Sequence, residues 1–261
     1  MDTSLKGKNA IICGSSQGIG LAAALELALN GASCILMARN AEALRAAVEG
    51  LPNQDGQQHR WVAVDFSDPS TVESEAKKIL QELRVEILVN NTGGPKAGPI
   101  LDAPANVFEL AFRQHLVCNQ ILAQAVVPGM REAGYGRIIN IISTSVKTPL
   151  ANLGVSNTIR LAVASWAKTL ANEIGRYNIT VNNILPGLTE TQRLTDLTKH
   201  MAAALKKDFL VVEEQMKESI PMRRFGKPEE IARVIAFLAS PAASYVNGTN
   251  IAVDGGRTPA L

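Results

Sequence analysis

The sequence predicts an α/β fold, in which a doubly wound, seven-stranded parallel sheet carries helices on both faces and residues 1–261 form a single domain. Short aliphatic runs alternate along the whole chain with longer amphipathic segments, an order typical of a parallel sheet with crossover helices. The short runs are almost entirely apolar, as expected for strands that are buried on both sides. A chain of 261 residues with 46% hydrophobic residues is long enough to bury such a core.

Each aliphatic run predicts a strand and each amphipathic segment predicts a helix. Asp68 followed by Pro69 is a typical helix start, because Asp caps the first N–H groups and Pro has no N–H to satisfy. Pro228 followed by two acids begins another helix. In chain order, the expected strands are 9–13, 33–38, 61–64, 87–89, 137–142, 179–185 and 250–253, and the expected helices are 18–30, 41–50, 69–83, 105–130, 152–175 and 226–239.

Composition and charge exclude several classes of function. A net charge of +2 gives no field suited to nucleic acid or to a membrane surface. The polar start at residues 1–8 lacks the apolar core of a signal peptide, and no apolar run approaches the roughly 18 residues of a membrane span. The three cysteines lie far apart in apolar runs, so they favour buried thiols over a metal site. We expect a cytoplasmic protein with no metal, nucleic-acid partner or membrane partner.

Residues 188–226 stand out because they contain no expected strand and have a polar, helical character. A segment that follows a strand end in this way is the usual place for a substrate lid. The alternative is a surface helical insertion that contacts no ligand.

A glycine-rich loop follows the first strand and opens the first helix. Residues 14–20 have the sequence GSSQGIG. Glycines allow a tight turn and a close approach of the backbone, so that a pyrophosphate can lie on the N–H groups of the helix start. This loop predicts a dinucleotide site, with contacts from Gly14, Ser15, Ser16, Gly18, Ile19 and Gly20.

The loops after the next strands indicate which dinucleotide binds. An acid at the end of the second strand would bind the 2′-hydroxyl of NAD and repel a 2′-phosphate, but Arg39 stands there and no acid precedes Glu42. Arg39 can pair with a phosphate, so NADP(H) is favoured over NAD(H); the alternative is a solvated arginine. Asp65 is placed to accept a hydrogen bond from the adenine amino group, and Asn91 and Gly93 lie where the backbone can approach the adenine ribose.

These motifs occur in one order over nearly the whole chain. The glycine loop and Asp65 are followed by NNTGG at 90–94, Ser143 after the fifth strand, a Pro-Gly pair after the sixth, and VDGG at 253–256. The set resembles the classical short-chain dehydrogenase/reductases, in length and ending the 3-oxoacyl-(acyl-carrier-protein) reductase branch. The resemblance implies a Rossmann fold, a nicotinamide cofactor, hydride transfer to or from a carbonyl or alcohol carbon of a small molecule, and a homotetramer or homodimer. Its further cofactor contacts fall on Phe66, Arg160, Pro186, Gly187 and Thr189.

Members of this family normally use an Asn–Ser–Tyr–Lys tetrad, of which only the serine, Ser143, is present. Ser156 stands at the tyrosine place, thirteen residues further on, and Arg160 stands at the lysine place. Counted back from AVVP at 125–128, the asparagine place falls on His115. The resemblance therefore assigns the catalytic positions to Ser143, Ser156, Arg160 and His115, with three departures from the family pattern.

These departures change the expected chemistry. A serine hydroxyl is a much weaker acid than a phenol, whose pKa is about 10, and arginine stays protonated and cannot relay protons. Arg160 could still bind the ribose, His115 could supply a proton or be a buried structural residue, and Ser156 could donate through water or only fill space. Loss of a general acid costs about 10²–10⁴-fold in rate, whereas proximity supplies about 7–11 kcal/mol without it.

Three functions are compatible with these residues. The first is an NAD(P)-dependent oxidoreductase with a non-standard proton path. The second is a dinucleotide-binding pseudoenzyme that acts as a sensor or partner subunit. The third is a non-redox lyase similar to the halohydrin dehalogenases; those proteins keep the tyrosine and lose the glycine loop, the reverse of this sequence.

Overall fold

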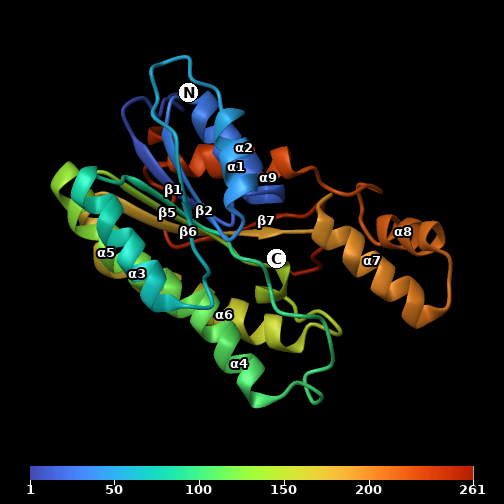
Figure 1. Ribbon diagram of the computed structural model, residues 1–261. Coiled ribbons are helices and arrows are strands. Elements are labelled where there is room, and N and C mark those ends of the chain that lie inside the picture. Colours follow the sequence, from blue (N-terminus) through green and yellow to red (C-terminus); the bar gives the residue numbers. More distant parts are fainter. Residues whose placement is uncertain (261) are drawn as a thin grey trace.

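The computed structural model describes residues 1–260, and a seven-stranded parallel sheet runs through its centre (Figure 1). The strand order is β3-β2-β1-β4-β5-β6-β7, so the chain winds outward from β1, returns to β4 and winds outward again. The point at which the order reverses, between β1 and β4, is where ligands bind in such sheets. The fold prediction is confirmed. The strands are β1 (Asn9–Cys13), β2 (Ser33–Ala38), β3 (Arg60–Ala63), β4 (Ile87–Asn90), β5 (Gly136–Ile141), β6 (Ile179–Pro186) and β7 (Asn250–Val253).

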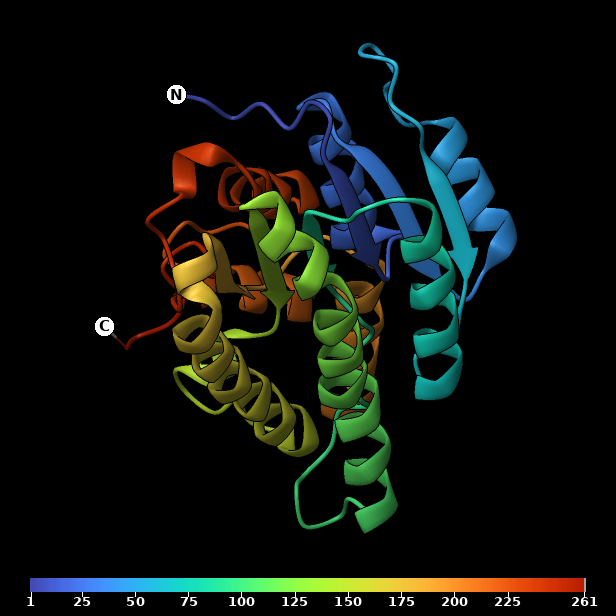
Figure 2. The same cartoon turned by 90° about the vertical axis from the view of Figure 1, so that its left-hand side faces the viewer.

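Helices cover both faces of the sheet, as Figures 1 and 2 show. A hydrophobic core lies on each face of the sheet. Neighbouring residues of one strand pack into different cores, Ile12 into the first and Ile11 into the second. This division follows from the alternation of side chains along a strand. The first core is closed by α1 (Gly18–Leu29), α2 (Ala41–Glu49) and α9 (Pro228–Ala239), and the second by α3 (Pro69–Glu82), α5 (Cys118–Ala133) and α6 (Gly154–Ile174).

A row of asparagine side chains crosses the sheet from β4 to β7. The Nδ2 of Asn90 donates to Oδ1 of Asn140, Asn140 donates to Asn183, and Asn183 donates to Asn250, each at 2.8 Å. The four residues are register partners on adjacent strands. Because buried amides are usually hydrogen-bonded, this row favours one register for the four strands β4 to β7.

The expected helical stretch over 105–130 is confirmed, but it is not α-helical throughout. It consists of α4 (Ala105–Phe112), a π-helical turn over Arg113–Val117, and α5, which ends at Gly134 in the left-handed conformation (φ 61°). A π-turn adds one residue to a helical turn, which hydrophobic periodicity does not reveal. The extra residue matters here because the turn contains His115.

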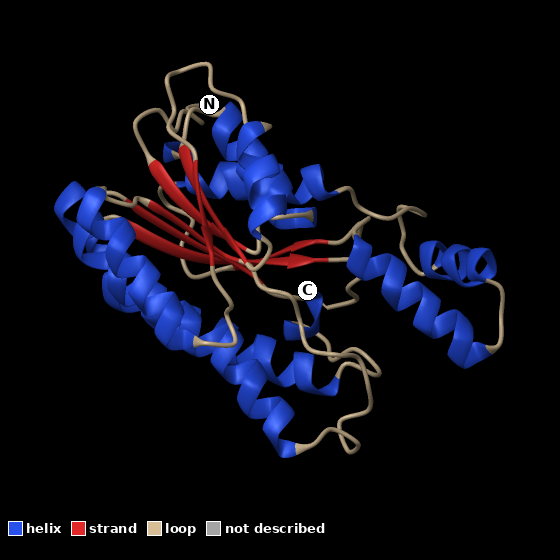
Figure 3. Cartoon of the chain, in the orientation of Figure 1, coloured by secondary structure: helices blue, strands red, loops and turns tan. Residues whose placement is uncertain are grey.

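Residues 188–226 form a separate helical pair beyond the carboxyl end of β6 (Figures 1 and 3). The helices are α7 (Gln192–Leu205) and α8 (Phe209–Glu218). They share a small apolar core that includes Leu194, Val212 and Phe225. The pair is therefore held by its own packing as well as by the loops that join it to β6 and α9. No helix within residues 1–260 is long and apolar enough to cross a membrane.

Candidate dinucleotide and catalytic site

A cavity of about 990 Å³ opens at the carboxyl ends of the strands, at the switch point between β1 and β4. Its volume is at the upper end of the range found for ligand pockets, about 300–1,000 Å³. The cavity brings together most of the residues that the sequence predicts for the site. Those that line it are Gly14, Ser16, Gly18, Ile19, Arg39, Asp65, Phe66, Asn91, Gly93, Ser143, Ser156, Arg160, Pro186, Gly187 and Thr189.

The glycine loop forms a tight cradle in one wall of this cavity. Gly14 has a φ of +59°, and a Cβ on it would lie 2.2 Å from the backbone oxygen of Asn91. A Cβ on Gly20 would lie 2.2 Å from the backbone oxygen of Gly14. The helix that follows has no side-chain cap at Gln17, so its first N–H groups face the cavity without an intrahelical partner. The cradle therefore fits a pyrophosphate.

Ser15 and Gly20 belong to this loop, but they are not among the described residues that line the cavity. The buried hydroxyl of Ser15 donates to the backbone oxygen of Ile12 at 2.8 Å and accepts from the N–H of Met37 at 3.1 Å. Ser15 therefore joins β1 to β2 below the loop. Gly20 permits the first turn of α1 to pass close to Gly14. Both residues shape the cradle from behind its surface.

Two side chains of opposite charge stand where β2 and β3 end. Arg39 is exposed, and Asp65, also exposed, accepts a hydrogen bond from the N–H of Ser67 at 2.9 Å. That bond, and to a smaller extent the charge of Arg39, holds the pKa of Asp65 below its usual value. Asp65 is therefore an ionised acceptor, and Arg39 is a cation at the edge of the cavity.

The loop after β4 is fastened to the cradle by Asn91. Its Nδ2 donates to the backbone oxygens of Cys13 and Gly14, both at 3.2 Å. These bonds connect the ends of β1 and β4, which border the switch point. The following residues, Thr92 and Gly93, form the adjacent part of the cavity wall.

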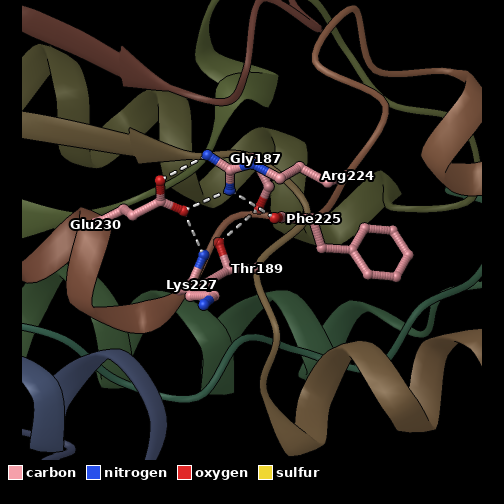
Figure 4. A network of polar contacts seen from close by, with 6 residues as sticks. All are labelled: Gly187, Thr189, Arg224, Phe225, Lys227 and Glu230. Atoms are coloured by element: carbon pink, nitrogen blue, oxygen red, sulfur yellow. Dashed lines mark hydrogen bonds and ion pairs between the residues drawn. The ribbon is translucent and has the colours of Figure 1, made fainter.

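The loop after β6 is held in place by a polar network at the start of α9, shown in Figure 4. Both terminal nitrogens of Arg224 bind the carboxylate of Glu230 at 2.7 Å, and the N–H of Lys227 donates to the same carboxylate at 2.8 Å. These contacts lower the pKa of Glu230 to about 2. A parallel bridge pairs Thr189 with Gly226, so the network fixes the backbone that presents the Pro186–Thr189 segment to the cavity.

Three of the four expected catalytic positions converge on the cavity. Ser143 lies at the end of β5 and its Oγ accepts from the N–H of Ser145 at 3.1 Å, an arrangement that leaves the hydroxyl proton to be donated. Arg160 lies one turn after Ser156 on α6 and donates to the backbone oxygens of Ile141 at 2.9 Å and Thr92 at 3.3 Å. Burial, with the nearby charge of Arg193, lowers the pKa of Arg160 to about 10, so its guanidinium is protonated at neutral pH.

The fourth expected position, His115, lies behind the cavity wall. It is 1% exposed, and its Nδ1 shares a 2.6 Å hydrogen bond with the Oγ1 of Thr92. Its Nε2 has no hydrogen-bond partner among residues 1–260. Burial and the charges of Arg160 and Arg193 hold the pKa of His115 well below its usual value. The structure thus gives a neutral imidazole that contacts the cavity wall through Thr92.

One cationic residue of this site is not predicted by any local sequence pattern. Arg193, on α7, lines the cavity and donates to the backbone oxygens of Gly94 at 3.0 Å and Pro95 at 3.5 Å. A Cβ on Gly94 would lie 2.6 Å from its Nη2. A single arginine on an amphipathic helix carries no local sequence signal, because its neighbours come from a loop almost 100 positions away.

Comparisons with known proteins agree with this geometry. Residues 14–258 match the family model described as enoyl-(acyl carrier protein) reductase. The 3-oxoacyl-(acyl-carrier-protein) reductase of Aquifex aeolicus is 31% identical over 259 residues, which cover 98% of this chain and 99% of the relative. The NADPH-dependent reductase BacG of Bacillus subtilis is 31% identical over 256 residues and covers 97% of this chain and 99% of its own.

The same agreement extends to solved structures. The L-sorbose reductase of Gluconobacter frateurii, solved with NADPH and L-sorbose, has a TM-score of 0.94 and 35% identity, and each chain is covered in full. All three proteins are named as reductases, two of them with NADPH, and they give no support to a pseudoenzyme. The chain belongs to the classical short-chain dehydrogenase/reductase family of NAD(P)-dependent oxidoreductases, in the branch that resembles 3-oxoacyl-(acyl-carrier-protein) reductase.

Proposed function

We propose that this protein is an NADPH-linked reductase of small carbonyl compounds, or an NADP⁺-linked dehydrogenase of the matching alcohols, that transfers the proton by a non-standard path. The single observation that carries the proposal is one cavity shared by the glycine cradle and by Ser143, Ser156 and Arg160. Bound NADPH would supply a hydride. The protein's own residues bind and orient the reactants and supply hydrogen bonds and positive charge.

The preference for NADP(H) over NAD(H) rests on Arg39. Its guanidinium can form paired hydrogen bonds with a 2′-phosphate, and the end of β2 carries no carboxylate before Glu42. Asp65 would hold the adenine and the cradle would hold the pyrophosphate. Several similar proteins were solved with NADPH or NADP, among them actinorhodin polyketide ketoreductase, which is 26% identical.

The proton path is proposed from the hydrogen bonds at the catalytic positions. Ser143 and Ser156 donate hydrogen bonds to the substrate oxygen, and the charge of Arg160 favours negative charge on that oxygen. Arg160 does not relay the proton, because it stays protonated. The proton comes from solvent through Ser156, and His115 positions Thr92 from behind the wall. Such a site lacks a strong general acid, whose absence costs about 10²–10⁴-fold in rate.

We propose that residues 1–261 act as one domain and that residues 188–226 serve as its substrate lid. Support for the lid comes from α7, which contributes Arg193, Leu194 and Leu197 to the cavity wall. We also propose that the protein is a homotetramer or homodimer, as the family resemblance implies. The composition of the sequence favours a location in the cytoplasm.

The decisive experiment follows the loss of NADPH absorbance with a panel of carbonyl compounds. Wild type is compared with the double variant Ser156→Tyr/Arg160→Lys, which restores the family residues. We expect both proteins to bind NADPH and both to reduce at least one common carbonyl, the variant faster. If the wild type reduces none while the double variant does, the reductase proposal fails for the natural protein.

The cofactor assignment has its own test. Arg39→Ala should weaken NADPH binding by about tenfold or more and leave NADH binding almost unchanged, since one charge-assisted bidentate contact is removed. Isothermal titration calorimetry measures both. Arg45→Ala on α2, which removes an arginine that does not line the cavity, is the control. Equal effects of Arg39→Ala on both cofactors would contradict the preference for NADP(H).

A further inference from the structure

Two guanidinium groups lie on the same side of the cavity. Arg160, from α6, donates to the backbone oxygen of Thr92, and Arg193, from α7, donates to that of Gly94, two residues further along the same loop. Ser156 precedes Arg160 by one helical turn, so Arg160 stands beside the place of the missing tyrosine. The two charges are close enough that Arg193 contributes to lowering the pKa of Arg160.

Neither guanidinium has an acidic partner in the part of the chain that the structure describes. Within residues 1–260, no carboxylate oxygen lies within 4.0 Å of Arg160 or Arg193, although eight such pairs occur elsewhere. Their hydrogen bonds go to backbone oxygens. Arg193 is exposed to solvent, but Arg160 is buried, and a buried cation that has a second cation nearby and no counter-charge is costly. This cost indicates that a ligand supplies the negative charge.

Two acidic residues that line the cavity, Asp65 and Glu190, lie near other cations. Asp65 stands near Arg39, whose charge helps lower its pKa. Glu190 acts on Lys217 and Arg224, whose pKa values it helps raise. Glu229 lies in the first turn of α9. The part of the cavity that holds Arg160 and Arg193 therefore keeps a positive potential, and a negatively charged ligand is attracted to it.

The geometry points to a carboxylate on the substrate. Arg193 has five N–H donors and uses two on Gly94 and Pro95, one of them in a long bond, so a forked contact with a carboxylate remains available. The cavity wall also contains aliphatic residues, among them Leu150, Leu153, Leu194 and Leu197. We propose that Arg193, supported by the charge of Arg160, binds the carboxylate of an oxo acid with an aliphatic body, and this inference rests on the reductase function proposed above.

The cofactor phosphates are the competing anions. Thr191 lies close to the glycine cradle, 3.3 Å from a Cβ placed on Gly18, and Arg193 is only two residues away. However, Arg193 is bonded to the loop at 94–95 rather than to the glycine loop. We therefore assign Arg193 to the substrate, and the experiment below measures both ligands.

The test uses matched probes that differ only in charge, 2-oxooctanoate and its methyl ester. Binding to protein saturated with NADP⁺, which cannot reduce either probe, is measured by calorimetry. Reduction of both probes is measured separately with NADPH. The variants are Arg193→Gln, Arg193→Lys and the control Lys199→Gln, which removes an exposed charge from α7 outside the cavity.

We expect Arg193→Gln to weaken binding of 2-oxooctanoate by about 10–100-fold, the range for losing charged hydrogen bonds. Arg193→Lys should retain part of the affinity, because it keeps the charge and loses the fork. Binding of the methyl ester, the affinity for NADPH, and the Lys199→Gln variant should all stay within about twofold of wild type. A larger KM for the acid alone should accompany the weaker binding.

Three results would overturn the inference: equal losses for acid and ester, weaker NADPH binding in Arg193→Gln, or no binding of 2-oxooctanoate by wild type at millimolar concentration. The two proposals fail separately. If the acid binds in an Arg193-dependent manner but no carbonyl compound is reduced, the reductase function is wrong and the carboxylate site stands. If the ester is reduced as well as the acid in every variant, the carboxylate site is wrong and the reductase function stands.

Discussion

The two ends of the cavity are built in different ways. At the cofactor end, the surface consists mainly of backbone, held by contacts such as those of Gly14 with Asn91. At the catalytic end, it consists of side chains from separate elements, such as Ser143 after β5, Arg160 on α6 and Arg193 on α7. The backbone cradle fits the pyrophosphate of any similar dinucleotide, whereas the side chains determine which reaction the bound cofactor takes part in. Changes at the two ends should therefore have separable effects.

The largest effect is expected at the cofactor end, from Gly20→Ala. A Cβ there would lie 2.2 Å from the backbone oxygen of Gly14, and neither main-chain segment can move without opening the loop. We expect at least about a hundredfold weaker NADPH binding, and a loss of stability at the upper end of single substitutions, about 3–5 kcal/mol. Calorimetry and urea denaturation measure the two quantities.

The matched control for that substitution is Gly98→Ala. A Cβ on Gly98 meets no atom within 4 Å. It should change the free energy of unfolding by less than about 1 kcal/mol and leave NADPH binding intact. Similar losses in both variants would show that the close approach of Gly20 to Gly14 is not what the cradle requires.

A change at the catalytic end should show the opposite pattern. Ser143→Ala removes a hydroxyl that lines the cavity but leaves the glycine cradle untouched. If Ser143 donates to the substrate oxygen, kcat/KM should fall by about 10²–10³-fold, as when an oxyanion donor is lost, while the Kd for NADPH stays within about twofold. A fall in NADPH affinity of the same size as the fall in kcat/KM would contradict the separation of the two ends.

Because of His115, at the catalytic end, the free energy of unfolding should depend on pH. The folded protein holds the pKa of His115 well below its usual value through burial and the charges of Arg160 and Arg193, whereas the unfolded chain protonates it near pH 6.5. The unfolded state then binds more protons as the pH falls below 6.5. The free energy of unfolding should therefore decrease there, by at most about 1.4 kcal/mol per pH unit.

The variant His115→Asn, which introduces the family residue, should flatten this part of the profile. Urea denaturation at pH 7.5 and pH 5 provides the measurement, with wild type and variant compared at each pH. An equally steep decline in the variant would show that another group, and not His115, causes the loss of stability in mild acid.

The smallest effect is expected at the network beside the Pro186–Thr189 segment. Glu230→Gln removes the exposed pair with Arg224, and such pairs contribute at most about 0.5–1 kcal/mol. The pKa of Glu230 is lowered to about 2 from 4.5, so its contribution is complete above pH 4.5 and is lost as the pH falls toward 2. Thermal unfolding at pH 7 and pH 2.5 should show a small difference between variant and wild type that shrinks at the lower pH.

Much of the cofactor end could be predicted because its signals are local. Seven residues, GSSQGIG, contain the turn, the close approach and the helix start, and Arg39 and Asp65 follow directly after their strands. The placement of Ser15 could not be predicted in the same way. Its hydroxyl is satisfied by Ile12 and Met37, and only the pairing of β1 with β2 brings Met37 near.

At the catalytic end, the sequence by itself determined which residue types occupy the family positions, and so excluded the usual tyrosine and lysine. Only the tertiary structure decided how those residues meet. A π-turn, invisible to hydrophobic periodicity, places His115 behind Thr92, and the packing of α7 against the loop at 94–95 brings Arg193 beside Arg160. Local patterns encode turns, caps and buried faces, whereas contacts between distant segments depend on how the whole chain packs.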